Sequence, residues 1–212
     1  MEEFVIEGGV PLRGEITPSG NKNAALPLLA ACLLTDEPVV LHNIPQIRDI
    51  FAMRKLIESI GAHVDEVDAN TWRITTRELT ASNLDPDLCR RIRASILIAG
   101  PVLARAGAVR LPPPGGDVIG RRRLDTHILA LHALGAKVNY DRIFDIEATE
   151  LRGADILLDE ASVTATENAV MAAVLAKGKT QIRNAASEPH VQELCTFLNL
   201  LGAQIDGIGS NT

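Results

Sequence analysis

Two kinds of hydrophobic segment alternate along the chain, and each occurs three times. The first kind is apolar on nearly all sides, which predicts helices that are buried all round. These segments are residues 24–34, 94–104 and 168–176. The second kind is amphipathic, with apolar residues every three or four positions and a closing glycine suited to a left-handed cap. Its three stripes are Ile50, Met53, Ile57 and Ile60, then Leu124, Ile128, Leu131 and Leu134, then Val191, Leu194, Leu198 and Leu201.

Short β-type segments flank these helices. We expect strands at residues 4–7, 72–75, 108–111, 143–147 and 180–184. The whole pattern predicts an α/β (α+β) fold with pseudo-threefold symmetry, because repeated units bury a core that no single unit could bury alone. The buried helices lie at the centre, and the sheets and amphipathic helices form the outer walls. We expect a single domain over residues 1–212, made of units at about 8–76, 77–148 and 149–209.

Parallel central helices would bring their N-termini to one face of this domain. That face would carry Lys22, Asn23, Arg91, Arg93, Ser162 and Thr164. Basic side chains and free helix N–H groups together favour phosphate or carboxylate binding. Pro27 fits this arrangement if it lies in the first turn, where no intrahelical partner is lost. The alternative is an ordinary capped helix with a solvated lysine.

Composition narrows the range of partners. Of the 212 residues only 3% are aromatic, so the core must consist of Ala, Leu, Ile and Val. The net charge of −6 argues against broad nucleic-acid binding. The start at Met1 is acidic where a secretory leader is basic, and no apolar run reaches membrane-spanning length. Cys32 and Cys195 fit small core residues, so we expect a cytoplasmic protein without metal or cofactor.

A glycine-rich loop is the second candidate for chemistry. Residues 111–127 place three prolines before Gly115 and Gly116, then Asp117, then an arginine triplet. Asp117 at a glycine hinge is typical of a mobile catalytic or gating loop. A plain surface turn with a solvated arginine cluster is the alternative. His127 follows on the amphipathic helix, where a lone histidine is more often structural than catalytic.

These motifs together resemble the enolpyruvyl transferase family, in particular the N-terminal half of its UDP-N-acetylglucosamine 1-carboxyvinyltransferases. The matching segments are residues 14–27, 93–96 and 114–120, Arg122 with Asp125 and His127, and residues 162–163 with 165–166. The resemblance implies an inside-out α/β barrel similar to EPSP synthase, with three repeats in each of two domains. It also implies transfer of the enolpyruvyl group of phosphoenolpyruvate to the 3′-hydroxyl of UDP-N-acetylglucosamine with release of phosphate, the first step of peptidoglycan synthesis.

The resemblance assigns roles to individual residues. Lys22, Arg93 and Arg122 would hold phosphoenolpyruvate, since arginine suits both its phosphate and its carboxylate. Asn23 would orient the sugar hydroxyl. The UDP-N-acetylglucosamine contacts implied by the family are Asn23, Arg93, Asp125, Ser162, Val163 and Thr164. Lys22, Asn23 and Asp117 would be the catalytic group.

Three departures from the family pattern bear on function. Asp117 stands where most members have cysteine, which predicts resistance to fosfomycin because that drug alkylates the thiol. Arg123 and Glu160 are unusual near the nucleotide site. The family chain is about twice as long, and its second domain supplies further catalytic groups and packs with the first residues. We therefore expect the 212-residue chain to be inactive alone, and either to self-associate or to pair with a C-terminal domain.

Overall fold

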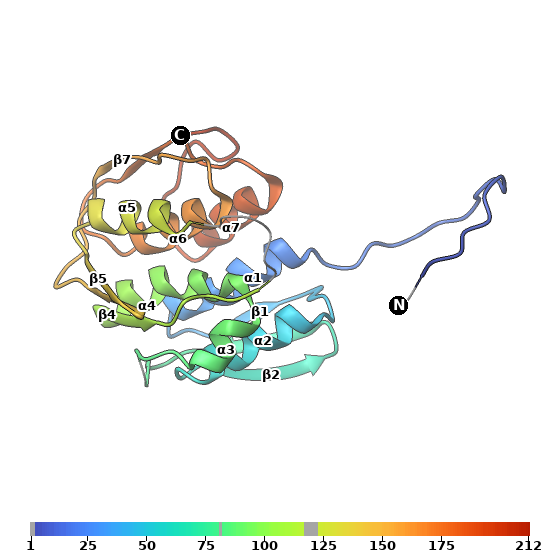
Figure 1. Ribbon diagram of the computed structural model, residues 1–212, viewed down its shortest axis with the longest axis horizontal. Helices are drawn as coiled ribbons and strands as arrows, with labels where there is room; N and C mark the ends of the chain where they lie inside the picture. The colour runs from blue at the N-terminus through green and yellow to red at the C-terminus, as the bar shows by residue number, and fades with distance from the viewer. Residues whose placement is uncertain (1–2, 81, 117–122) are drawn as a thin grey trace.

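The computed structural model describes residues 3–80, 82–116 and 123–212. Figure 1 shows the helices gathered in the body of the molecule, with strands such as β2, β4 and β7 toward its outside. The first third of the chain contains α1 (Lys22–Ala31), η1 (Cys32–Leu34), β1 (Val39–Leu41), α2 (Arg48–Glu58), β2 (His63–Asp68) and β3 (Thr71–Thr75). The middle third contains α3 (Pro86–Arg91), η2 (Arg93–Ile98), α4 (Ala99–Ala106), β4 (Ala108–Leu111), α5 (Asp125–Ala133), β5 (Lys137–Asp141) and β6 (Ile143–Glu147). The last third contains β7 (Asp155–Leu157), α6 (Val163–Ala173), β8 (Gln181–Arg183) and α7 (Pro189–Leu200).

The apolar helices α1, α4 and α6 form the core, as their all-round hydrophobicity predicts. Leu29 of α1, Val102 of α4 and Met171 of α6 are each fully buried. The helix α4 packs directly on α6. Gly100 makes this approach possible, because a Cβ there would lie only 2.6 Å from both the backbone oxygen and the side-chain Oδ1 of Asn168. Burial of these aliphatic side chains is the main favourable term for the fold.

The sheets on the outside follow the repeat, with one exception. In the first, β3 is the central strand and pairs antiparallel with β1 and β2. In the second, β6 is central and pairs antiparallel with β4 and β5. The third sheet has only the parallel pair β7 and β8 within the described residues. Residues 203–212, which follow α7 where the other units place a strand pair, are irregular.

The helices α2, α5 and α7 and the residues directly after them bury the predicted stripes, apart from Leu124, Ile128 and Leu201. Leu201 is 41% exposed, and Leu124 and Ile128 are half-buried. Each helix is followed by a glycine with positive φ, at +117° for Gly61, +99° for Gly135 and +106° for Gly202. This left-handed conformation is one that glycine adopts without steric cost, so the predicted helix ends are confirmed. The fold class is therefore confirmed as well, whereas the unit boundaries remain a prediction.

The starts of the buried helices differ from the predictions. Asn21 caps α1 by accepting from the backbone N–H groups of Asn23 and Ala24, so the helix begins at Lys22. Pro27 therefore lies inside α1 and not in its first turn, and the expectation about its position was wrong. In the middle unit Pro101 lies in the first turn of α4, and the preceding residues form the 3₁₀ helix η2.

The strand expected at residues 4–7 is absent. Residues 3–20 are irregular in the structure, and Figure 1 shows this segment running away from the body. Phe4 and Ile6 are 96% and 84% exposed. The sequence pattern was right about the apolar character, but a strand also needs a partner for its backbone groups. No described segment supplies that partner.

A buried carboxyl group lies in the core helix α6. Glu167 is 1% exposed, and its Oε1 has no hydrogen-bond partner among the described residues. Burial and, secondarily, the charge of Glu188 raise the pKa of Glu167 to about 8. Between the ordinary value of 4.5 and about 8, the folded protein holds a proton that the unfolded chain releases. The free energy of unfolding therefore falls as pH rises through this window.

Replacing Glu167 with glutamine removes this pH dependence and keeps the shape of the side chain. We expect Glu167→Gln to raise the free energy of unfolding at pH 8 by at least about 1.4 kcal/mol, the equivalent of one pKa unit. At pH 4.5 the variant and the wild type should be nearly equal, because both side chains are then neutral. Urea unfolding at the two pH values measures this, with Glu147→Gln on the exposed face of β6 as the control. Parallel pH curves for Glu167→Gln and wild type would contradict it.

Candidate functional site

The starts of η2, α5 and α6 meet in one place. His127 in the first turn of α5 lies with its Nε2 3.2 Å from Oγ1 of Thr164 in the first turn of α6. Arg93, the first residue of η2, is close enough for its charge to act on the same imidazole. Residues from the second and third units, far apart in sequence, therefore share one surface. The convergence of Lys22 and Asn23 on the same place remains a prediction.

His127 is buried and uncharged. It is 3% exposed, and its Nδ1 lies 3.1 Å from Nδ2 of Asn168. Burial lowers the pKa of His127 to about 3, and the positive charge of Arg93 contributes to the same effect. An imidazole in this state does not act as a general base near neutral pH. Its role is to hold hydrogen bonds between helices.

Lys22 and Asn23 lie in the first turn of α1, at the helix N-terminus predicted for an anion. The Nζ of Lys22 is 3.0 Å from Oδ2 of Asp49 in the first turn of α2. Both side chains are partly exposed, at 46% and 40%, so the pair is weak and a ligand can compete for it. Asn23 is exposed. The helix α1 packs against η2, so the first unit adjoins the surface that carries Arg93.

The predicted nucleotide contacts lie at the starts of α5 and α6. Ser162 is the N-cap of α6, with its Oγ 3.4 Å from the backbone N of Ala165. Val163 and Thr164 follow and are half-buried. Asp125 begins α5, is exposed, and accepts a hydrogen bond from Arg123. The unusual Arg123 thus has a carboxylate partner beside the candidate site.

Two predicted residues of the glycine loop, Asp117 and Arg122, lie outside the described residues. The structure does describe the approach to them. Gly116 has φ of +90°, and a Cβ there would lie 3.1 Å from both the backbone N and the Cβ of Arg93. The backbone N of Gly115 donates to the carbonyl oxygen of Cys89 at 3.0 Å. The chain therefore enters the loop from beside Arg93.

Arg91 does not start a helix, contrary to the prediction for the ligand face. It is the last residue of α3 and is exposed. No helix was predicted at residues 86–91, because an isolated six-residue helix leaves little periodic signal. Of the two arginines, Arg93 is the one that heads the next buried segment.

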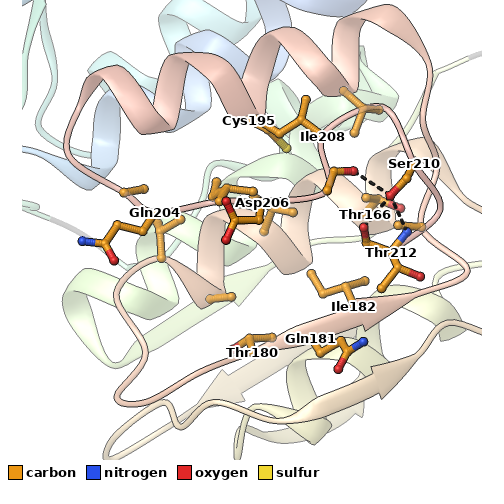
Figure 2. A pocket seen from close by; sticks show the side chains of 18 of the residues that line it. Thr166, Thr180, Gln181, Ile182, Cys195, Gln204, Asp206, Ile208, Ser210 and Thr212 are labelled. Carbon is orange, nitrogen blue, oxygen red and sulfur yellow. Dashed lines mark hydrogen bonds between the residues drawn. The ribbon is translucent and has the colours of Figure 1, made fainter.

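A large cavity lies elsewhere, in the third unit. Its volume is about 840 Å³, and it is bounded by α6, β8, α7 and the residues after α7. Figure 2 shows Cys195 of α7 on one side, Ile182 of β8 on the other, and Gln204 and Asp206 between them. The predicted site residues that the structure describes do not line it. Its position matches the place where the first two sheets have additional strands.

Three contributors to the site were missed or undervalued by sequence reasoning. Asp49, the partner of Lys22, carried no motif signal beyond its place in the first turn of a helix. His127 was considered mainly structural, and its contact with Thr164 depends on tertiary packing. Asn168 opened the expected apolar helix, but the polar side chain inside an apolar run was itself a usable signal, because buried amides need partners.

The cysteines offer no reactive thiol. Cys32, Cys89 and Cys195 are all buried and free. Burial raises the pKa of Cys32 to about 12 and that of Cys89 and Cys195 to about 11 each. These thiols stay protonated at neutral pH, and the thiolate is the reactive form. No helix within the described residues is long and apolar enough to cross a membrane.

Comparison with known sequences gives the family. The profile described as EPSP synthase (3-phosphoshikimate 1-carboxyvinyltransferase) matches residues 6–212. The chain is 58% identical to a UDP-N-acetylglucosamine 1-carboxyvinyltransferase of Treponema denticola over 100% of its length. It is 60% identical to that of Bradyrhizobium diazoefficiens over 99% of its length. It covers 50% and 49% of these two proteins, so it spans about half the length of the curated relatives it matches.

Solved structures agree with the fold. The enolpyruvyl transferase NikO from Streptomyces tendae superposes with a TM-score of 0.78 at 24% identity, over 94% of this chain and 47% of that chain. EPSP synthase from Acinetobacter baumannii superposes with a TM-score of 0.71 at 15% identity, over 92% of this chain and 45% of that chain. With the sequence match over nearly the whole length, these findings show that the chain belongs to the EPSP synthase family of enolpyruvyl transferases.

Proposed function

We propose that this chain forms one wall of the active site of a UDP-N-acetylglucosamine 1-carboxyvinyltransferase. The enzyme would transfer the enolpyruvyl group of phosphoenolpyruvate to the 3′-hydroxyl of UDP-N-acetylglucosamine and release phosphate, which begins peptidoglycan synthesis. The single observation that carries the proposal is the meeting of Arg93, His127 and Thr164 at the starts of three helical segments. The names of the relatives point to the same reaction.

The cationic side of this surface would take phosphoenolpyruvate. Lys22 lies at the N-terminus of α1, whose free backbone N–H groups and dipole favour an anion. Arg93 would add a planar donor pair for a phosphate or carboxylate. Arg122 would complete the set from the glycine loop. Asn23 would orient the accepting sugar hydroxyl from the position next to Lys22.

The chemistry needs one proton delivered to C3 and two removed, the first from the 3′-hydroxyl and the second from C3. The 3′-hydroxyl oxygen gives up its proton to a base, which the second domain would supply, and bonds to C2 of phosphoenolpyruvate while a proton goes to C3. A proton then leaves C3 as the C2–O bond to phosphate breaks, so the enol double bond is restored and phosphate departs. Asp117 is our candidate for the proton donor, which requires a carboxyl group that is protonated near neutral pH.

The start of α6 would bind the nucleotide. Ser162, Val163 and Thr164 present the N-cap and the first helical turn, where backbone N–H groups are unsatisfied by the helix itself. Diphosphate oxygens suit this site. Asp125, at the start of the neighbouring α5, would lie on the uracil side.

A complete active site would need a second wall, since the chain spans about half the length of its relatives. We propose that a C-terminal domain of the family pairs with this one, or that two copies associate, and that turnover requires the pairing. The exposed apolar segment at residues 4–16 supports such an association. Buried free cysteines fit a reducing, cytoplasmic compartment.

Phosphate release tests the proposed activity. We expect the 212-residue chain mixed with the family's C-terminal half to release phosphate from phosphoenolpyruvate only when UDP-N-acetylglucosamine is present. Lys22→Ala should lower the rate about 100-fold or more, because a charged group aimed at the reacting phosphate is lost. Lys179→Ala, at the remote cavity, is the matched control and should keep the wild-type rate. Equal rates for the two variants, or no release by the mixture, would contradict the proposal.

Fosfomycin provides a separate test of the loop assignment. We expect no covalent adduct on the wild-type chain, because Asp117 has no thiol and the three cysteines are buried with raised pKa values. Asp117→Cys should become labelled when UDP-N-acetylglucosamine is present. Intact-protein mass spectrometry distinguishes the two. An adduct on the wild type would show that the resistance hypothesis is wrong.

A further inference from the structure

We infer that His127 is a positioning residue that turns the hydroxyl hydrogen of Thr164 toward the diphosphate of the bound UDP-sugar. This inference rests on the proposed function and deepens it. His127 itself would touch no substrate atom, because it is almost fully buried behind Thr164. The amide of Asn168 fixes the tautomer of His127, and that tautomer fixes the direction of the Thr164 hydroxyl.

The first link is Asn168, whose amide can lie in only one orientation. Its Oδ1 accepts a hydrogen bond from the backbone N of Gly100 at 2.7 Å. Its Nδ2 donates to the backbone oxygen of Ile96 at 2.7 Å. A flipped amide would set its NH₂ group against the backbone N–H of Gly100 and its oxygen against the backbone oxygen of Ile96. Because all these groups are buried, the flipped state would leave unsatisfied donors and acceptors in the core.

The second link is the tautomer of His127. The remaining Nδ2 hydrogen of Asn168 points to Nδ1 of the imidazole at 3.1 Å. Nδ1 must therefore accept, and the neutral ring then carries its hydrogen on Nε2. Nε2 is the atom that lies 3.2 Å from Oγ1 of Thr164. Thr164 consequently accepts a hydrogen bond from His127, and its own hydroxyl hydrogen must point to another acceptor.

The imidazole cannot escape this state by protonation at ordinary pH. A proton on Nδ1 would face the Nδ2 hydrogens of Asn168, and the added charge would lie near Arg93. Among the described residues, the groups that act on the ring are Arg93, Thr164 and Asn168, and none of these three is acidic. The neighbouring carboxylate Asp159 accepts from Thr126 at 2.7 Å. Burial and Arg93 accordingly hold the pKa of His127 near 3.

The third link is the free hydrogen of Thr164. Among the described residues, no acceptor is assigned to that hydrogen, and the side chain is half-buried at the open end of α6. It lies in the first turn, beside unsatisfied backbone N–H groups, and Arg93 is close enough for its charge to act on the neighbouring His127. A hydroxyl left to donate, next to helix donors, suits an anionic oxygen such as that of a diphosphate.

A purely structural network would tie α4, α5 and α6 together without orienting Thr164, and the tautomer separates the two explanations. We expect ¹⁵N NMR of the imidazole of His127 in the 212-residue chain to show hydrogen on Nε2 and none on Nδ1. The signal should stay unchanged from pH 5 to pH 8, in keeping with a pKa near 3. Hydrogen on Nδ1, or titration in that range, would overturn the inference.

Binding of UDP-N-acetylglucosamine, measured by calorimetry, tests the hydroxyl. Thr164→Val keeps the shape and removes the donor, and should weaken binding about tenfold, whereas Thr164→Ser should bind like wild type. His127→Gln keeps a donor toward Thr164 and should retain most of the affinity, whereas His127→Phe should lose it. Thr196→Val is the matched control, because Thr196 lies on α7, outside the proposed site, and its hydroxyl donates to the carbonyl oxygen of Gln192 in the same helix.

The outcomes separate this inference from the proposed function. If the wild-type chain binds UDP-N-acetylglucosamine, and Thr164→Val binds it with the same affinity as Thr196→Val, the role of Thr164 is overturned and the proposed function stands. No binding by the wild-type chain would contradict the proposed function at this wall, and the ligand part of the inference with it. Thermal unfolding of each variant shows whether a lost affinity is a lost fold.

Discussion

The rest of the structure depends on the close contact between α4 and α6. Gly100 lets the two buried helices approach until the side chain of Asn168 reaches the backbone of the η2–α4 segment. This contact joins the second unit to the third inside an aliphatic core, where an unmade polar contact is costly. It also fixes Asn168, and through it His127 and Thr164. Packing at the centre of the molecule thereby sets the direction of a hydrogen bond at its surface.

The proposed anion site lies on a chain that is acidic overall. The net charge of −6 is spread over the outside, whereas the helix N-termini bring backbone donors, Lys22 and Arg93 to one region. Without a ligand, Lys22 forms an ion pair with Asp49, and because both side chains are partly exposed this pair contributes little to stability. A bound phosphate would replace the carboxylate of Asp49 as the anionic partner of Lys22. The site is therefore built from local donors that work against the overall charge.

The sequence predicted the elements that depend on local pattern, and it failed where tertiary contacts decide. All-round apolar segments and three-four stripes located the buried and amphipathic helices, and the closing glycines gave the helix ends. The strand at residues 4–7 failed because β-structure needs a partner that no local pattern reveals. Lys22, Arg93 and Thr164 were identified from motifs. The pairing of Asp49 with Lys22 and the contact of His127 with Thr164 could not be predicted from motifs, because both depend on which side chains the fold brings together.

Mapping ligand contacts on the backbone tests the central claim most directly. Amide NMR spectra of the chain, recorded while phosphoenolpyruvate and UDP-N-acetylglucosamine are added, report which residues sense the ligands. The account predicts shifts at residues 22–24, 93–96, 125–128 and 162–165, the starts of α1, η2, α5 and α6. Shifts confined to the third-unit cavity, at residues 178–182 and 203–210, would contradict it and place the ligand site in that cavity.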